Sequence, residues 1–351
     1  MTRIRELDAL RGFAVCGIML VNTWQHTVGA VQRRSATPID WIVENLLQSR
    51  FFPIFSFLFG VSFVLFLRSA ARRTPQPRLV LLRRLAVLAC LGLLHRMVNP
   101  GEVLLPYAVT GAIVLVPASY LHRRLVLLAG IAATLWAALA HAGGVWLIPG
   151  VFLLGMAVIE YGPGPRALRP AFIAGALLGV VLTGAWVYLW GRPGAFDFPY
   201  TVSVYPLAGL ADATAYCTGV LLLLRYRPGS LAILEPLGRM ALTAYLSGTL
   251  AILAALPLLV LDGSRAGVVA VAGVTIAVQA AFAHWWLARF RYGPLEWAWR
   301  CLTWWEIVPN RRSPGEPPGE TPLRPPGEPP AESPPPPPGE PPPEGGQRPL
   351  A

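Results

Sequence analysis

Hydrophobic residues along the chain gather into long runs, separated by short segments rich in arginine, proline and glycine. Runs of this kind predict membrane-spanning helices, because about 20 apolar residues cross the hydrocarbon layer of a bilayer. The pattern therefore predicts an all-α, polytopic helix bundle of about ten spans within residues 1–309. The ten runs are residues 10–28, 51–67, 85–98, 103–121, 125–141, 145–161, 171–190, 202–224, 240–261 and 267–288.

Composition excludes an ordinary soluble protein. Of the 351 residues, 54% are hydrophobic and 13% are charged, and the mean hydropathy is +0.52. Soluble domains carry about 25% charged residues, so this chain lacks the side chains that would coat a soluble surface. We therefore expect a lipid bilayer as its main partner. The four cysteines are widely spaced, so we predict neither a disulfide framework nor a metal site.

Arginine supplies the whole positive charge, because the chain contains no lysine. This excludes Schiff-base chemistry and a Walker-type phosphate loop, both of which need a lysine amine. The arginines concentrate in alternate loops, which predicts that both termini lie in the cytoplasm. This placement also explains the net charge of +11 without a nucleic-acid partner. The arginine-rich loops are the N-terminus, 68–84, 122–124, 162–170, 225–239 and 289–293.

Residues 310–351 differ from the rest of the chain. They repeat Gly-Glu-Pro-Pro from Gly315, Gly327 and Gly339, and they contain a run of five prolines. Such a segment has too little apolar surface to fold, so we predict an extended, disordered tail. Binding of a proline-reading partner is the alternative to a merely solubilising role.

The first predicted helix carries three polar residues on one face. Asp8, Arg11 and Asn22 are separated by whole numbers of helical turns, and this face must point into the bundle. Asp8 and Arg11 can form an ion pair, and Asn22 lies about 16 Å further along the helix. Asn22 is a candidate site residue or an interhelical hydrogen-bonding group, and Arg11 is a candidate phosphate ligand.

A second polar group surrounds the turn Asn99-Pro100-Gly101. This turn should bring His95 and Glu102 together, and a carboxylate beside an imidazole is suited to a general base. A hydrogen-bonded pair that merely closes the hairpin is the alternative. His26 is a further candidate, although its place near a helix end also suits residence at the membrane interface.

Four further residues are notable for their position. Asp212 lies inside the run 202–224 and needs a partner there. Arg239 precedes a predicted helix and is either a phosphate contact or a topology determinant. Glu296 and Arg300 are spaced for an i, i+4 ion pair on a short interfacial helix that starts at Pro294.

Six motifs together resemble the YeiB-like bacterial membrane proteins, which carry the domain of unknown function 418. This resemblance implies a protein of the bacterial inner membrane. These motifs appear in the order of that family and cover most of residues 5–305, but not the proline-rich tail. The chain departs from the family pattern at Glu102, where aspartate is usual, and at Ala244, where asparagine is usual. The motifs are residues 5–14, 17–22, 50–60, 83–95 with Tyr107, 238–243 and 293–297.

This family is itself similar, at its N-terminus, to the heparan-α-glucosaminide N-acetyltransferase group of transmembrane acyltransferases. The similarity implies acyl transfer from cytoplasmic acyl-CoA, with an asparagine and a histidine in the site. The asparagine matches Asn22, whereas no histidine of this chain has the matching spacing, because His26 lies too close to Asn22.

Three hypotheses about function follow. The first is an acyltransferase in which arginines bind the CoA phosphates and His95 or His26 acts as the base. The second is a transporter for a small molecule, with Asn22, His95, Glu102 and Asp212 along a polar path. The third is a non-catalytic membrane assembly protein.

Overall fold

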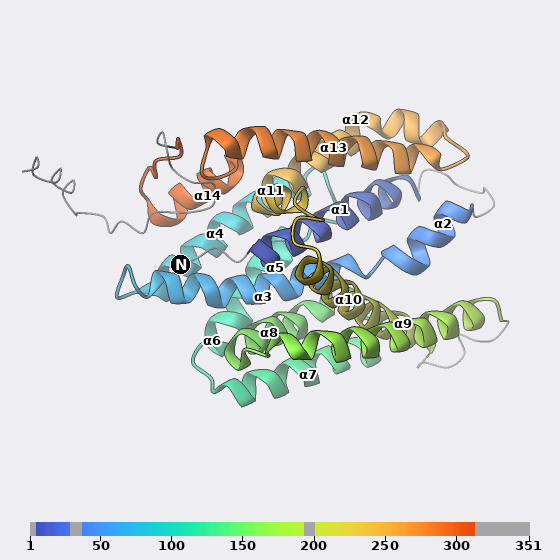
Figure 1. Ribbon diagram of the computed structural model, residues 1–351, viewed down its shortest axis with the longest axis horizontal. Coiled ribbons are helices and arrows are strands. Elements are labelled where there is room, and N and C mark those ends of the chain that lie inside the picture. The colour runs from blue at the N-terminus through green and yellow to red at the C-terminus, as the bar shows by residue number, and fades with distance from the viewer. Residues whose placement is uncertain (1–4, 29–36, 193–200, 313–351) are drawn as a thin grey trace, which may run out of the picture. The chain divides into compact units, whose positions relative to one another are not determined.

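The computed structural model describes residues 5–28, 37–192 and 201–312, and these residues form helices and no strand apart from an isolated bridge between Phe290 and Arg311 (Figure 1). The predicted tail lies outside the described residues from position 313 onward. The helices are α1 (Arg5–Val28), α2 (Pro38–Ile42), α3 (Phe51–Ala70), α4 (Pro77–Arg96), α5 (Leu104–Thr110), α6 (Val116–Ala118), α7 (Arg123–Ala140), α8 (Leu147–Tyr161), α9 (Leu168–Trp190), α10 (Thr201–Tyr226), α11 (Leu234–Arg239), α12 (Ala241–Leu261), α13 (Ala266–Arg289) and α14 (Pro294–Trp304).

Every predicted span corresponds to a helix or a short helical series. Among the described residues, seven helices are long and apolar enough to cross a membrane. The protein is therefore an all-α, multi-pass membrane protein. Of the other three predicted spans, α1 and α4 contain several charged or polar residues, and the helical stretch Leu104–Ala118 is shorter. These three remain predictions as membrane spans.

The predicted start of α4 is wrong by eight residues. The hydrophobic run begins at residue 85, whereas the helix begins at Pro77 and includes Arg83 and Arg84. These two arginines are accommodated because each guanidinium lies over an aromatic ring, that of Trp305 at 4.6 Å and that of Trp299 at 3.6 Å.

Helix α1 is surrounded by the rest of the bundle. It packs against α3, α11, α12 and α13, and Figure 1 shows it in dark blue between α3 and the orange pair α12 and α13. On another side of α3, α8 packs against α3 and α7 packs against α8, while α9 and α10 form a closely packed pair. This central position turns the polar face of α1 toward other helices.

Two glycines allow α1 and α11 to touch backbone to backbone. A Cβ atom at Gly12 would collide with the carbonyl oxygen of Leu234, and one at Gly238 would collide with the carbonyl oxygen of Asp8. Small residues permit such close helix crossings in membrane proteins. Because Arg11 precedes Gly12 and Arg239 follows Gly238, the crossing fixes both arginines in the same region.

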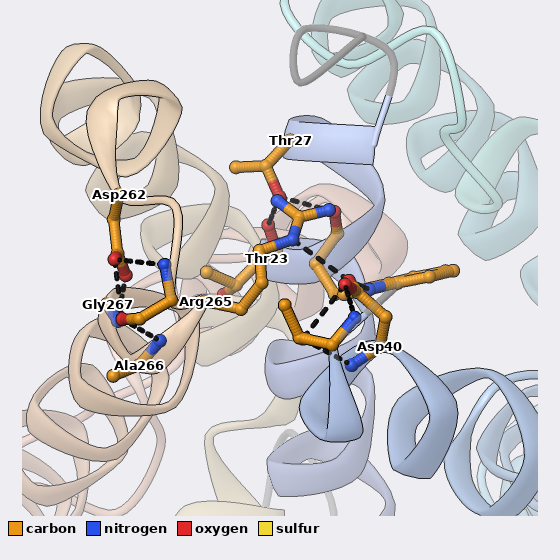
Figure 2. Close-up of polar contacts among 10 residues, drawn as sticks. Thr23, Thr27, Asp40, Asp262, Arg265, Ala266 and Gly267 are labelled. Carbon is orange, nitrogen blue, oxygen red and sulfur yellow. Dashed lines mark hydrogen bonds and ion pairs between the residues drawn. The ribbon is translucent and has the colours of Figure 1, made fainter. Parts of the chain in front are cut away.

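The opposite end of α1 is held by Arg265, which precedes α13. Its guanidinium donates to Asp40 Oδ1 at 2.9 Å and to Thr27 Oγ1 at 2.7 Å (Figure 2). Asp40 also accepts from the indole N–H of Trp24 at 2.8 Å. Arg265 has a positive φ of 64°, which is unusual for a residue with a side chain, so these contacts stabilise a strained turn.

Residues 310–312 pair with the end of α13 and the residues after it. The N–H of Arg291 donates to the Asn310 carbonyl oxygen at 2.8 Å, and the N–H of Tyr292 donates to Asn310 Oδ1 at 2.9 Å. Asn310, which the composition assigned to the tail, is thus bonded to the helical part of the protein.

Candidate functional site

A cavity of about 290 Å³ lies among α1, α3, α4, α5, α11, α12 and α14. Its middle is apolar, with walls that include Phe55, Leu58, Leu85, Leu88 and Leu242. Polar side chains gather toward its ends. We call the end with Arg11, Arg84, Arg239 and Arg300 the arginine end, and the end with Asn22 and Thr249 the far end.

One face of α1 forms a wall along the cavity. Arg11, Val15, Ile18, Met19 and Asn22 all line it, at the spacing of one helix face. At 1.5 Å per residue, Arg11 and Asn22 are about 16 Å apart along the helix. The structure therefore places two of the predicted site residues in the same cavity, one at each end.

At the arginine end, Arg11 forms the ion pair with Asp8 that the sequence predicted, at 2.8 Å. It also donates to Ser62 Oγ at 2.6 Å. Arg239, the other predicted phosphate ligand, lines the same cavity and donates to the carbonyl oxygen of Arg291 at 3.2 Å. Both candidate phosphate ligands are thus brought together.

Two arginines that line this end are held by aromatic rings. The guanidinium of Arg84 lies 3.6 Å from the ring centroid of Trp299 and 4.7 Å from that of Phe66. That of Arg300 lies 4.8 Å from the ring of Tyr292. The arginine pattern of the loops predicts a topology role for Arg84 and does not place it in a cavity. A signal was present, since Arg84 belongs to the motif of residues 83–95 that the chain shares with the family it resembles.

The predicted ion pair between Glu296 and Arg300 is wrong. The Glu296 carboxylate instead accepts from the N–H groups of Leu242 and Thr243, at 2.8 and 3.0 Å, and from the Thr243 hydroxyl at 2.6 Å. The N–H groups at the start of α12 have no partner within their own helix, and they bind the carboxylate in place of Arg300, whose guanidinium lies over the Tyr292 ring. Burial nevertheless raises the pKa of Glu296 above its ordinary value, against the effect of these hydrogen bonds.

The far end contains Asn22 and, next to the cavity, two histidines. His26 Nδ1 lies 2.9 Å from the carbonyl oxygen of Asn22, and His95 Nε2 lies 3.0 Å from Thr249 Oγ1. Asn22 and Thr249 line the cavity, whereas neither histidine does. Each histidine has a second ring nitrogen, His26 Nε2 and His95 Nδ1, that is buried and finds no hydrogen-bond partner among the described residues.

The predicted pairing of His95 with Glu102 is also wrong. The turn at Asn99 forms, but the Glu102 carboxylate accepts from the N–H of Leu105, at 3.0 and 3.2 Å, and so caps α5. Burial raises the pKa of Glu102, and its backbone hydrogen bonds oppose this rise. Glu102 does not line the cavity, so it is not part of the wall that contains Asn22.

Asp212 lies away from the cavity, in α10. Its carboxylate accepts from Arg50 Nε at 3.1 Å and from the Thr183 hydroxyl at 3.0 Å. The Arg50 side chain is fully buried. The partner that Asp212 requires is thus Arg50, which lies 162 positions away in the sequence. The sequence did not predict this pair.

Together these features describe a multi-pass helical membrane protein with an internal cavity between an arginine cluster and a polar far end. Residues 161–306 match the family described as "Protein of unknown function (DUF418)". The chain is also 32% identical, over 345 residues, to the "Uncharacterized 39.9 kDa protein in amylase 3'region" of Bacillus acidopullulyticus, a match that covers 89% of this chain and 95% of that relative. The chain belongs to the DUF418 family, as its motifs predicted. No solved structure matches it.

Proposed function

We propose that this protein binds an anionic, acyl-bearing ligand in the cavity and transfers the acyl group, with acyl-CoA as the donor class. The observation that carries this proposal is the position of Arg11 and Asn22 on one face of α1, about 16 Å apart and in the same cavity. An acyl-CoA with its phosphates near Arg11 and its thioester near Asn22 would match that order of surfaces.

Each region of the cavity supports one part of such a ligand. The arginine end favours the negative charge of the CoA phosphates, and the apolar middle accommodates the uncharged arm that joins these phosphates to the thioester. At the far end, the Asn22 side chain offers both a hydrogen-bond donor and an acceptor. An amide donor of this kind can stabilise the oxyanion that forms during acyl transfer.

The proposed reaction is attack by a hydroxyl or amine acceptor on the thioester carbonyl. A new C–O or C–N bond forms, the C–S bond breaks, and CoA leaves as a thiolate that takes up a proton. His95 would accept the proton of the acceptor through the hydroxyl of Thr249, which lines the cavity and lies 3.0 Å from His95 Nε2. His26 is the alternative base, since its Nε2 is buried and has no hydrogen-bond partner among the described residues.

The transporter hypothesis receives less support. It required Asp212 and Glu102 to share a polar path with Asn22, but Asp212 is bonded to Arg50 and Thr183, and Glu102 caps α5. Neither carboxylate lines the cavity.

The test uses purified full-length protein and palmitoyl-CoA labelled in the acyl chain. We expect release of the free CoA thiol and loss of label from the donor when alcohol or amine acceptors are supplied. Asn22→Ala should reduce the rate by about 100-fold, the scale of losing one oxyanion donor, with an unchanged melting temperature. Gln25→Ala is the control, because this residue is exposed on the same helix and lies outside the cavity.

Two results would contradict the proposal. One is the absence of palmitoyl-CoA binding to the folded protein. The other is a loss of stability in Asn22→Ala with no change in rate, which would mean that Asn22 is only an interhelical hydrogen-bonding group.

A further inference from the structure

We propose that Arg84 and Arg300 form a phosphate-binding site at the arginine end, and that the ligand's head group is a phosphate or pyrophosphate. This inference deepens the proposed function and rests on it for the acyl chain, but the phosphate site can be tested alone. Neither arginine was among the phosphate ligands expected from the sequence.

The first argument is the absence of a carboxylate partner. Among the residues that the structure describes, Arg11, Arg50, Arg68 and Arg265 each form an ion pair with an aspartate or glutamate. Within the same ranges, Arg84 and Arg300 form none, although both line the cavity. Glu296, an acid that lines the cavity, is already bonded to the start of α12.

The second argument is the orientation of the two guanidinium groups. Both are held by their flat faces, Arg84 against Trp299 and Phe66, and Arg300 against Tyr292. Stacking of this kind leaves the N–H donors at the edge of the group available, and this edge is the fork that binds phosphate oxygens. Arg300 Nε is buried and has no hydrogen-bond partner among the described residues.

The third argument is the accumulation of like charge. The positive charges of Arg11 and Arg300 both act on Arg84. Repulsion of this kind is strong in a medium of low dielectric constant, and a bound anion relieves it. A doubly charged phosphate relieves it better than a carboxylate, and its additional oxygens can accept from both forks at once.

The site is also preformed. The indole N–H of Trp299 donates to the carbonyl oxygen of Arg84 at 2.8 Å, so the ring that supports the guanidinium is bonded to the arginine's own backbone. Trp299 and Arg300 are adjacent on α14, which packs against α4. The side chains therefore lose little conformational freedom when an anion binds.

The experiment measures binding to the full chain in detergent by isothermal titration. The probes are inorganic pyrophosphate, palmitoyl-CoA, palmitoyl lysophosphatidate and palmitate. The variants are Arg84→Gln and Arg300→Gln. Arg78→Gln is the matched control, because Arg78 also stacks on an aromatic ring, that of Tyr120 at 3.8 Å, but does not line the cavity.

We expect each cavity variant to weaken binding of pyrophosphate by about tenfold or more, since a hydrogen bond to a charged group contributes about 1.5–3 kcal/mol. Palmitate should be affected less, and Arg78→Gln should bind every probe as the unaltered protein does. Palmitoyl-CoA and palmitoyl lysophosphatidate separate the two sources of the phosphate. Tighter binding of palmitoyl-CoA, with a stronger dependence on Arg84, indicates a nucleotide-borne head group. The same result for palmitoyl lysophosphatidate indicates a lipid-borne head group.

Failure of this inference differs from failure of the proposed function. If all three acyl probes bind equally and neither variant changes the affinity for pyrophosphate, the phosphate site is refuted while acyl binding stands. If no acyl probe binds but pyrophosphate still binds through Arg84 and Arg300, the proposed function fails and the phosphate site stands. Absence of binding for all four probes overturns both.

Discussion

Glu296 on α14 accepts hydrogen bonds from both the backbone N–H and the hydroxyl of Thr243 at the start of α12. A carboxylate in this position satisfies N–H groups that have no partner within their own helix, and it interacts favourably with the helix dipole. The contact joins α14 to α12 beside Trp299 and Arg300. It therefore helps to hold the residues that line the arginine end.

The first prediction concerns the pH dependence of stability. Burial raises the pKa of Glu296 above the unfolded value of about 4.5, so the folded state holds the proton more tightly. Stability should then be greatest below that unfolded pKa and should fall as pH rises through the folded pKa. Glu296→Gln keeps an acceptor for the two N–H groups but does not ionise, so it should remove this part of the decline. The melting temperature between pH 4.5 and 8, at one scan rate, measures the difference.

Glu296→Ala serves as the comparison for the same site. It removes the acceptor altogether and should cost about 1–3 kcal/mol at the acid end of this range, because buried N–H groups lose their partner. The difference from the unaltered protein should shrink as pH rises, because alanine does not ionise. If the Gln variant follows the same pH profile as the unaltered protein, the assignment of the decline to Glu296 is incorrect.

The second prediction tests the crossing of α1 and α11. Gly12→Ala places a methyl group against the Leu234 carbonyl oxygen, so the helices must separate, at a cost of about 1–3 kcal/mol. Gly184→Ala is the control, because nothing lies within 4 Å of the added atom. It should be neutral or slightly stabilising, since alanine favours helix over glycine. Equal melting temperatures for the two variants would mean that the crossing tolerates the extra atom.

The third prediction compares two ion pairs. Asp212→Asn leaves the fully buried Arg50 without its counter-charge and should destabilise the protein by about 3–5 kcal/mol. Glu160→Gln breaks the pair with Arg68, whose side chain is 48% exposed, and should cost no more than about 1 kcal/mol. Denaturant-dependent unfolding in detergent measures both. A loss for Asp212→Asn as small as that for Glu160→Gln would show that Thr183 and water replace the pair.

Helical periodicity predicted what depends on a single helix. It placed Arg11 and Asn22 on the same inward face, because residues eleven positions apart are three turns apart. It also predicted the Asp8–Arg11 pair, which is local. Hydrophobic runs likewise predicted where the helices lie, because the length needed to cross a bilayer is a property of the segment alone.

Contacts between distant segments could not be predicted in this way. The partner of Asp212 depends on how α3 and α10 pack, which no local pattern encodes. His95 and Glu102 are close in sequence, yet each side chain bonds elsewhere, because Thr249 and the N–H group at the start of α5 are better placed. Arg84 has the sequence surroundings of a topology determinant, and only the packing of α14 on α4 turns it toward the cavity.

The last prediction concerns the topology, and it decides whether α4 and the stretch Leu104–Ala118 span the membrane. The arginine asymmetry predicts that the turn after α4 lies outside and that the segment after α6 lies in the cytoplasm. In a full-length protein without its native cysteines, Gly101→Cys should react with a membrane-impermeant maleimide in intact spheroplasts. Leu121→Cys and Pro309→Cys are exposed in the structure and should react only after permeabilisation. Labelling of Pro309→Cys from outside would invert the predicted orientation, and protection of Gly101→Cys would mean that α4 does not cross the membrane. With the predicted result, the arginine end of the cavity opens toward the cytoplasm, where a phosphate-bearing donor would have to enter.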